Sequence, residues 1–337
     1  MRLSRRDFLK ASAALAGAIA AAGAGPVAIQ QAATQEAAQG RLPIIWLNGL
    51  GCSGCSISLL NSVSLDTIDH LVLNRLDLQY HPTLMAAAGQ PAVAAAEAAR
   101  KKKGYVLVVE GAIPTTEGGR YCWLWPGMTM LAGVQSFAAD AQCILAVGTC
   151  AAYGGVSGAG GRQNPTGSKG VRDLGLGKPL INVPGCPAHP DWIVGTIAAL
   201  MAGRPPVLDE LGRPQPYYAT RVHDACPNLD RFNQTYGRRM SKGHGKNKSC
   251  LSCHAAGDSH VFTPRTVGSA GCLYALGCKG RFTFADCPTR RWNGAAAGAP
   301  GVNWCVGAQS PCMGCTQPEF PDGMSPFMTL GGMGARG

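Results

Sequence analysis

Cysteine dominates the chemistry that this sequence could perform. The chain has 15 cysteines in 337 residues. An odd number, in a chain long enough to build its own core, argues for bound metal rather than a disulfide framework. The first two, Cys52 and Cys55, form a C-x-x-C pair in a glycine-rich turn. Such a pair alone fits a redox dithiol, half of a zinc site, or two corners of an iron–sulfur cluster.

Apolar runs that alternate with helical stretches must position these thiols. This alternation predicts an α/β fold, a doubly wound parallel sheet over residues 41–204. The expected strands are residues 42–47, 71–73, 105–109, 143–147 and 180–183, and the expected helices are residues 56–64, 83–103, 128–140 and 191–201.

Four cysteines fall just past predicted strands. Cys52 and Cys55 follow the first strand, Cys150 the fourth and Cys186 the fifth. Ligands of such sheets collect beyond the carboxyl ends of the strands, so these thiols are expected to converge there. The positions of these four cysteines after the strands therefore favour a cluster more strongly than the C-x-x-C spacing does.

The sequence from residue 205 onward loses this periodicity. It is rich in Gly and Pro and holds nine of the fifteen cysteines. A segment of this kind cannot build a large apolar core, so we expect bound clusters to hold a second, largely irregular domain together over residues 205–337.

The N-terminus predicts export. Residues 4–10, SRRDFLK, match the twin-arginine pattern, and an Ala/Gly-rich apolar run follows to Gly25. Residues 1–40 are expected to be a cleaved signal segment and the mature chain to be periplasmic, with no membrane span of its own. The twin-arginine route carries folded proteins, which suits cofactors inserted before export.

The net charge of +11 does not indicate a nucleic-acid partner. Four of the positive residues lie in the signal segment, a run at residues 100–103 closes a predicted helix, and others flank cysteines. A four-iron cluster with four thiolates carries about two negative charges, which part of this basicity would neutralise.

Seven motifs, in order along nearly the whole chain, carry a family resemblance: GLGCSGCSISLLNS, EGAIPT, VGTCAAYGG, VPGCP, HDACP, CLYALGCKG and PCMGC. Together with the export signal they resemble the small subunit of periplasmic nickel–iron hydrogenases. The resemblance implies a flavodoxin-like domain and an irregular domain that hold three iron–sulfur clusters. These clusters connect the nickel–iron site of a separate large subunit to an external acceptor such as a cytochrome, with H2 oxidation as the expected direction.

The resemblance also implies the ligands of each cluster, and no catalytic residue in this chain. The proximal 4Fe-4S cluster would be bound by Cys52, Cys55, Cys150 and Cys186, the distal 4Fe-4S cluster by His223, Cys226, Cys272 and Cys278, and the medial cluster by Cys287, Cys305, Cys312 and Cys315.

The chain departs from the family at three positions. Many members have a proline after the tryptophan that corresponds to Trp304, and a three-iron medial cluster; Cys305 here predicts a four-iron cluster, usually of lower potential. Cys122 matches one of two extra cysteines of oxygen-tolerant members, but Gly54 occupies the place of the other, so an ordinary proximal cluster is expected. Gly51 replaces a glutamate found in many members.

A C-x-x-C-H stretch lies in an insertion over residues 232–270. Cys250, Cys253 and His254 have the spacing of a covalent haem c, with Met240, His244 or His260 as a sixth ligand. A local disulfide, a small zinc site and a loop with no cofactor are the other interpretations. Covalent haem attachment favours an unfolded chain outside the cytoplasm, whereas this protein is expected to arrive folded.

Two other functions share some of these features. A cluster-binding chain of a quinone-reducing complex would have the first domain, but such chains generally lack the three-cluster second domain and the export signal. A secreted, disulfide-stabilised binding protein would have cysteines and no iron. Iron content separates this last class from the other two.

Overall fold

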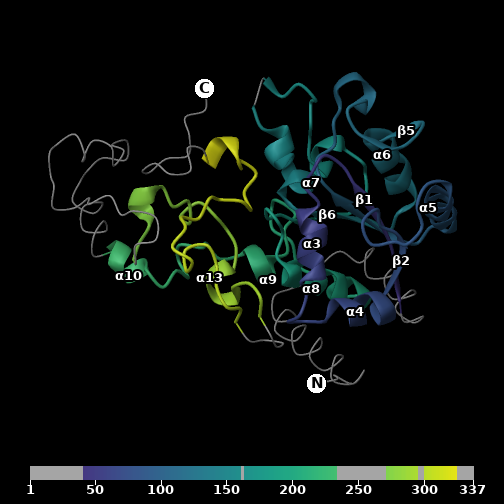
Figure 1. Ribbon diagram of the computed structural model, residues 1–337. Helices are drawn as coiled ribbons and strands as arrows, with labels where there is room; N and C mark the ends of the chain where they lie inside the picture. Colours follow the sequence, from purple (N-terminus) through teal and green to yellow (C-terminus); the bar gives the residue numbers. More distant parts are fainter. Residues whose placement is uncertain (1–40, 161–162, 234–270, 295–299, 325–337) are drawn as a thin grey trace.

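A five-stranded parallel sheet forms the centre of the computed structural model, which describes residues 41–160, 163–233, 271–294 and 300–324 (Figure 1). The strand order is β2-β1-β3-β6-β7, which is the flavodoxin-like order with the first strand between the second and third. The strands are β1 (Leu42–Asn48), β2 (Leu76–Tyr80), β3 (Val106–Glu110), β6 (Cys143–Val147) and β7 (Leu180–Val183).

The central strands are apolar along their whole length because helices cover both faces of the sheet. Every residue of β3 (VLVVE) and β6 (CILAV) is buried, and the two strands pair in register from Val106 opposite Cys143 to Glu110 opposite Val147. Continuous apolar runs are typical of parallel strands buried on both faces. The predicted fold class is therefore confirmed.

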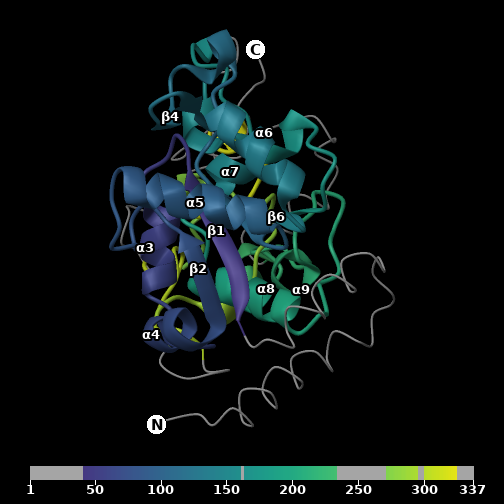
Figure 2. The same ribbon diagram turned by 90° about the vertical axis from the view of Figure 1, so that its right-hand side faces the viewer.

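Two helices lie on each face of the sheet. Helices α5 (Gln90–Lys102) and α6 (Met130–Asp140) pack on one face through Ala96, Val134 and Phe137, and Figure 2 is viewed from this side, with α5 in front. Helices α3 (Gly54–Leu60) and α8 (Pro190–Met201) pack on the other face. The basic run that was expected to close a helix lies in the last turn of α5 and just beyond it.

The predicted strand at residues 71–73 is wrong. These residues belong to the π-helical turn η1 (Leu71–Arg75), in which Leu71 is buried while Leu73 is 64% exposed, and β2 begins only at Leu76. The helix expected from residue 83 begins at Gln90 instead, because Pro91 is tolerated only in the first turn of a helix. Met128, expected in a helix, pairs in the hairpin of β4 (Trp123–Trp125) and β5 (Met128–Thr129).

The cysteine-rich second part lies against the α3/α8 face of the sheet. In Figure 1 its green-to-yellow segments stand on the side of the sheet opposite α5. Leu273, Ala285, Trp304 and Val306 from this part join the core that contains Trp46 and α8. Its described elements are short, as the loss of periodicity predicts: α9 (Gln215–Tyr218), α10 (Leu229–Phe232), η7 (Tyr274–Leu276), α13 (Cys287–Arg290) and η8 (Asp322–Met324).

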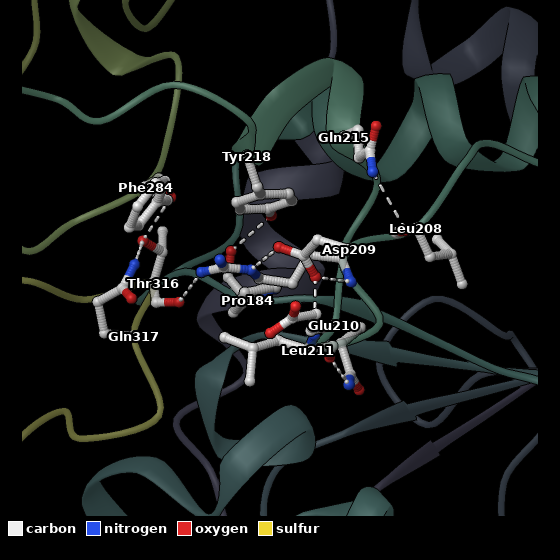
Figure 3. A network of polar contacts seen from close by, with 12 residues as sticks. Pro184, Leu208, Asp209, Glu210, Leu211, Gln215, Tyr218, Phe284, Thr316 and Gln317 are labelled. Atoms are coloured by element: carbon white, nitrogen blue, oxygen red, sulfur yellow. Dashed lines mark hydrogen bonds and ion pairs between the residues drawn. The ribbon is translucent and has the colours of Figure 1, made fainter. Parts of the chain in front are cut away.

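A buried arginine fastens this second part to the sheet. Arg213, 4% exposed, pairs with Asp209 at 2.7 Å and donates to the carbonyl of Thr316 at 3.4 Å. Figure 3 shows Thr316 and Gln317 at the left of this network, Pro184 and Tyr218 near its centre and Asp209 to their right. The Tyr218 hydroxyl donates to the Pro184 carbonyl, 2.7 Å away. The network thus joins residues just after β7 to a segment more than a hundred residues later.

The remaining described elements are α4 (Ile68–His70), η2 (Thr116–Gly119), α7 (Thr149–Tyr153), η3 (Gly155–Gly158) and η5 (Val171–Leu174). Within the described ranges, no helix has the length and apolarity needed to cross a membrane. The expected signal segment and the C-x-x-C-H stretch lie outside the described residues.

Candidate metal-cluster sites

Four predicted ligands converge at the carboxyl edge of the sheet, and we call them the edge group: Cys52, Cys55, Cys150 and Cys186. Burial, and after it the charge of Glu110, raises the pKa of the Cys55 thiol well above its ordinary value, and Cys150 and Cys186 raise it further. The pKa of Cys186, raised to about 11 chiefly by burial, also responds to Cys150 and Cys52. Four thiolates this close require cations to neutralise them, so metal binding would release protons here.

Glycines beside the edge group leave space around its sulfurs for a bound cluster. A β-carbon at Gly148 would lie 2.6 Å from the Cys55 sulfur, and one at Gly155 would lie 2.8 Å from the Cys150 sulfur. Gly54 is similar, since its β-carbon would lie 3.0 Å from the Cys52 sulfur. Any larger side chain would push against the sulfurs, so the glycines fit a cluster that several loops must approach closely.

Backbone N–H groups point at the same sulfurs. The amide of Ala188 donates to the Cys55 sulfur at 3.5 Å. The amides of Val156 and Ser157 donate to Cys150, which lowers the pKa of that thiol against the larger, opposite effect of burial. Hydrogen bonds of this kind stabilise the charge on cluster sulfurs and help to set the reduction potential.

Glu110, at the end of β3, holds the start of the helix that carries Cys55 of the edge group. Its buried carboxylate accepts hydrogen bonds from the amides of Cys55 (2.9 Å) and Ser56 (3.1 Å), from Trp46 Nε1 (3.0 Å) and from the Ser56 hydroxyl. The carboxylate thereby satisfies the first amides of α3, the helix that carries Cys55. Sequence reasoning assigned Glu110 no role, although a single acidic residue that ends an apolar strand was a visible signal.

His81 completes this buried network. Its Nδ1 accepts from the amides of Thr83 (3.1 Å) and Leu84 (3.3 Å), so Nε2 carries the proton and faces the Ser56 hydroxyl at 3.3 Å. Burial lowers the pKa of His81 to about 4, and the imidazole is therefore neutral at pH 7.

A second set, the middle group, lies between the sheet and the outer part of the molecule: Cys287, Cys305, Cys312 and Cys315. Burial raises the pKa of Cys287 well above its ordinary value, and the other three thiols raise it further, which places the four near one another. Burial likewise raises the pKa of Cys315 to about 12, opposed by a hydrogen bond from the amide of Cys186. The Thr149 hydroxyl, next to Cys150, also donates to the carbonyl of Cys315, so the middle group adjoins the edge group.

The third set, the outer group, lines a single pocket: His223, Cys226, Cys272 and Cys278. Burial, and then the charge of Arg281, lowers the pKa of His223, so its imidazole is neutral as a metal ligand must be. The Arg281 guanidinium also lies 5.3 Å from the ring centre of Phe232, which packs edge-on against His223. The amide of Cys312 donates to the Cys278 sulfur at 3.4 Å, so this group adjoins the middle group.

The structure thus places the predicted ligands in three neighbouring regions, and the binding of a cluster by each set stays a prediction. No disulfide joins any two cysteines in the described parts of the chain. Within the same ranges, no three His, Cys, Asp or Glu side chains are close enough to share one metal ion. In a four-iron cluster each thiolate binds a different iron, so its ligands stand farther apart. Of the two described cysteines outside the sets, Cys143 is buried in β6 and Cys122 is half-buried.

A doubly wound sheet with thiols at its carboxyl edge, followed by an irregular cysteine-rich part, defines a two-part α/β oxidoreductase subunit. Residues 52–200 match the family model of the 20 kDa subunit of NADH ubiquinone oxidoreductase, and residues 218–328 match that of the C-terminal domain of the NiFe/NiFeSe hydrogenase small subunit. The second match separates the two kinds of enzyme that share the first domain.

Individual relatives agree with the second match. The chain is 39% identical to the periplasmic [NiFeSe] hydrogenase small subunit of Desulfomicrobium baculatum, over 97% of this chain and 99% of that protein. It is 38% identical to the periplasmic [NiFe] hydrogenase small subunit of Solidesulfovibrio fructosivorans, over 98% and 94%. The solved reduced, active Ni-Fe-Se hydrogenase of D. baculatum superposes with a TM-score of 0.72, covering 86% of this chain and 100% of the solved chain. The chain belongs to the small subunits of the nickel–iron hydrogenases, enzymes whose catalytic site is in the large subunit.

Proposed function

We propose that this chain carries electrons between the nickel–iron site of its large subunit and an external acceptor through three 4Fe-4S clusters, in the direction of H2 oxidation. The observation that carries the proposal is the order of the three groups. The hydroxyl of Thr149, the residue before Cys150 of the edge group, donates to the carbonyl of Cys315 in the middle group, and an amide of the middle group donates to a sulfur of the outer group. Three redox centres held in this way form a continuous relay.

Each group offers the donors that a cluster needs. The edge and middle groups each supply four thiols, and the outer group supplies three thiols and a neutral imidazole. When bound, the clusters would supply one-electron redox chemistry. The chain itself binds them, shields them with buried walls and directs amides at their sulfurs. Cys305 gives the middle group its fourth thiol, and Gly54 leaves the edge group with an ordinary set of four.

Iron content tests this proposal most directly. We expect about twelve non-haem irons per chain in the complex purified from its own periplasm, because three four-iron clusters require that number. Iron is measured together with a pyridine haemochrome spectrum. Near-zero iron in the intact complex would contradict the proposal. It would favour the alternative of a disulfide-stabilised binding protein.

The same spectrum decides between the interpretations of the C-x-x-C-H stretch. A c-type band would assign Cys250, Cys253 and His254 to a haem. In the sequence this haem would lie between two ligands of the outer group, the group from which electrons would leave the chain. Full cluster iron without the band would leave a disulfide, a zinc site or a loop with no cofactor. Mature protein from the periplasm also gives the N-terminal residue, and a start within or just after residues 1–40 is the expected sign of twin-arginine export.

The large subunit is proposed to cover the edge group. Cys52 and Cys186 are exposed in the isolated chain, although a cluster at this position needs protection from water. Two exposed apolar residues lie near other members of the edge group: Ile57 (50% exposed), two residues after Cys55 on α3, and Val156 (56% exposed), whose amide donates to Cys150. Exposed apolar residues around an incompletely buried site are typical of a large obligate interface.

A charge on this surface should block assembly. We expect Ile57→Glu to weaken the binding of the large subunit by tenfold or more, equal to about 1.4 kcal/mol or more, because the carboxylate would lose its hydration in the interface. Leu73→Glu is the matched control, since Leu73 is 64% exposed at the opposite edge of the sheet. The measurement is the fraction of chain that co-elutes with the large subunit. Equal assembly of the two variants would exclude this face.

A further inference from the structure

A single buried hydroxyl lies where the edge and middle groups meet. Thr149, the first residue of α7, is 1% exposed. Its Oγ1 accepts a hydrogen bond from the amide of Gly185 at 2.9 Å and donates its own proton to the carbonyl of Cys315. Its backbone amide also donates to the carbonyl of Gly185 at 2.9 Å. The hydroxyl therefore links two segments of the chain: it accepts a hydrogen bond from Gly185 and donates one to Cys315.

Each of these segments carries a predicted ligand. Cys150 follows Thr149 directly, and Cys186 follows Gly185, so both neighbours belong to the edge group. Cys315, the residue that accepts from the hydroxyl, belongs to the middle group. The Cys186 amide lies close enough to the Cys315 thiol to lower its pKa, against the larger effect of burial. The hydroxyl of Thr149 thus holds together the segments that carry Cys186 and Cys315.

Other hydrogen bonds also hold each of these two segments in place. Arg213 holds the carbonyl of Thr316, next to Cys315, and is itself fixed by Asp209. The Tyr218 hydroxyl holds the carbonyl of Pro184, next to Gly185. Pro184, Tyr218 and Thr316 are labelled in Figure 3. Each segment therefore has its own anchor, and the Thr149 hydroxyl is the group that joins Gly185 directly to Cys315.

We propose that Thr149 is a positioning residue for electron transfer: its hydroxyl joins the Gly185–Cys186 segment to Cys315 and so fixes the junction between the proximal and medial clusters. The inference rests on the proposed function and adds a specific route to it. One electron crosses the junction, no proton moves with it, and no bond at Thr149 forms or breaks. An amide directed at a cluster sulfur stabilises the reduced cluster, so the approach of the Cys186 amide to Cys315 raises the potential of the medial cluster.

The hydroxyl can be removed without changing the shape of the side chain. Thr149→Val leaves the amide of Gly185 and the carbonyl of Cys315 without this partner, which favours separation of the two segments. Thr149→Ser keeps the hydroxyl and loses only a methyl group. Thr196→Val is the matched control, because Thr196 is equally buried at 1% exposure and its hydroxyl donates to the Trp192 carbonyl at 2.6 Å within α8.

The experiment is a potentiometric EPR titration of the whole heterodimer, purified with its clusters. In Thr149→Val we expect a lower midpoint potential of the medial cluster and a weaker magnetic splitting between reduced proximal and medial clusters. We also expect H2-driven reduction of an external acceptor to be slower by about tenfold or more, the usual effect of losing a group that orients a metal ligand. Thr149→Ser and Thr196→Val should match the unaltered complex.

An unchanged medial potential and splitting in Thr149→Val would overturn the inference. So would the same change in Thr196→Val, which would show a general effect of lost buried hydroxyls. Should Thr149→Val fail to retain iron, Thr149→Ala gives the decisive comparison with Thr149→Ser, because alanine leaves space and removes the hydroxyl. Failure of the proposed function would appear separately, as missing cluster signals in the unaltered complex.

Discussion

Replacing Glu110 with leucine should cost the protein about 4 kcal/mol or more of its free energy of unfolding and empty the edge group of iron. The buried carboxylate accepts four hydrogen bonds, two from the first amides of α3, one from Trp46 and one from Ser56. Each donor left without a partner costs about 1–3 kcal/mol. A loss of this size is a large part of the total stability of a folded domain.

Two further variants separate the causes of that loss. Glu97→Leu removes an acidic group whose pairing with Arg100 is partly exposed, so it should cost about 1 kcal/mol or less. Glu110→Gln keeps the shape and one acceptor oxygen, and should retain iron while raising the potential of the proximal cluster, because a negative charge beside it is gone. Anaerobic thermal unfolding and iron content are the measurements. Equal stability of Glu110→Leu and Glu97→Leu would show that the carboxylate has no supporting role.

The sheet and the position of its thiols were predictable because their signals are local or follow from topology. Five apolar runs indicated strands, and four of them are strands in the structure. The positions of Cys150 and Cys186, just after the fourth and fifth predicted strands, are enough to place both thiols at one edge of the sheet. The error at residues 71–73 has a local cause, since three apolar residues suit one helical turn as well as a short strand.

The polar contacts that organise the sites left no such signal. The hydroxyl of Thr149 meets a carbonyl 166 residues later in the chain, and Arg213 meets one 103 residues later. Neither partner is marked by residue type, because any residue offers a carbonyl. The irregular part around the middle and outer groups has no hydrophobic period from which its path could be derived. The resemblance supplied the predicted ligands of this part, and the structure added the hydrogen bonds around them.

Cys305→Pro should convert the middle group from a four-iron to a three-iron site, with about eleven irons per chain instead of about twelve. Proline suits this position because the amide of Cys305 donates to no backbone carbonyl within the described residues and faces its own thiol instead. The remaining thiols of Cys287, Cys312 and Cys315 can hold three irons. A three-iron cluster carries less charge on its core and has a higher potential, which would trap electrons midway along the relay.

EPR of the oxidised complex measures this change directly, since an oxidised three-iron cluster gives a signal where an oxidised four-iron cluster gives none. We expect the signal in Cys305→Pro and a raised medial potential, with the clusters of the edge and outer groups unchanged. Cys143→Ala is the matched control, because Cys143 is buried in β6 and belongs to none of the three groups. It should leave iron content and spectrum as they are. An unaltered complex that already shows the three-iron signal would mean that Cys305 is not a ligand, and the flat potential profile inferred from its thiol would have to be given up.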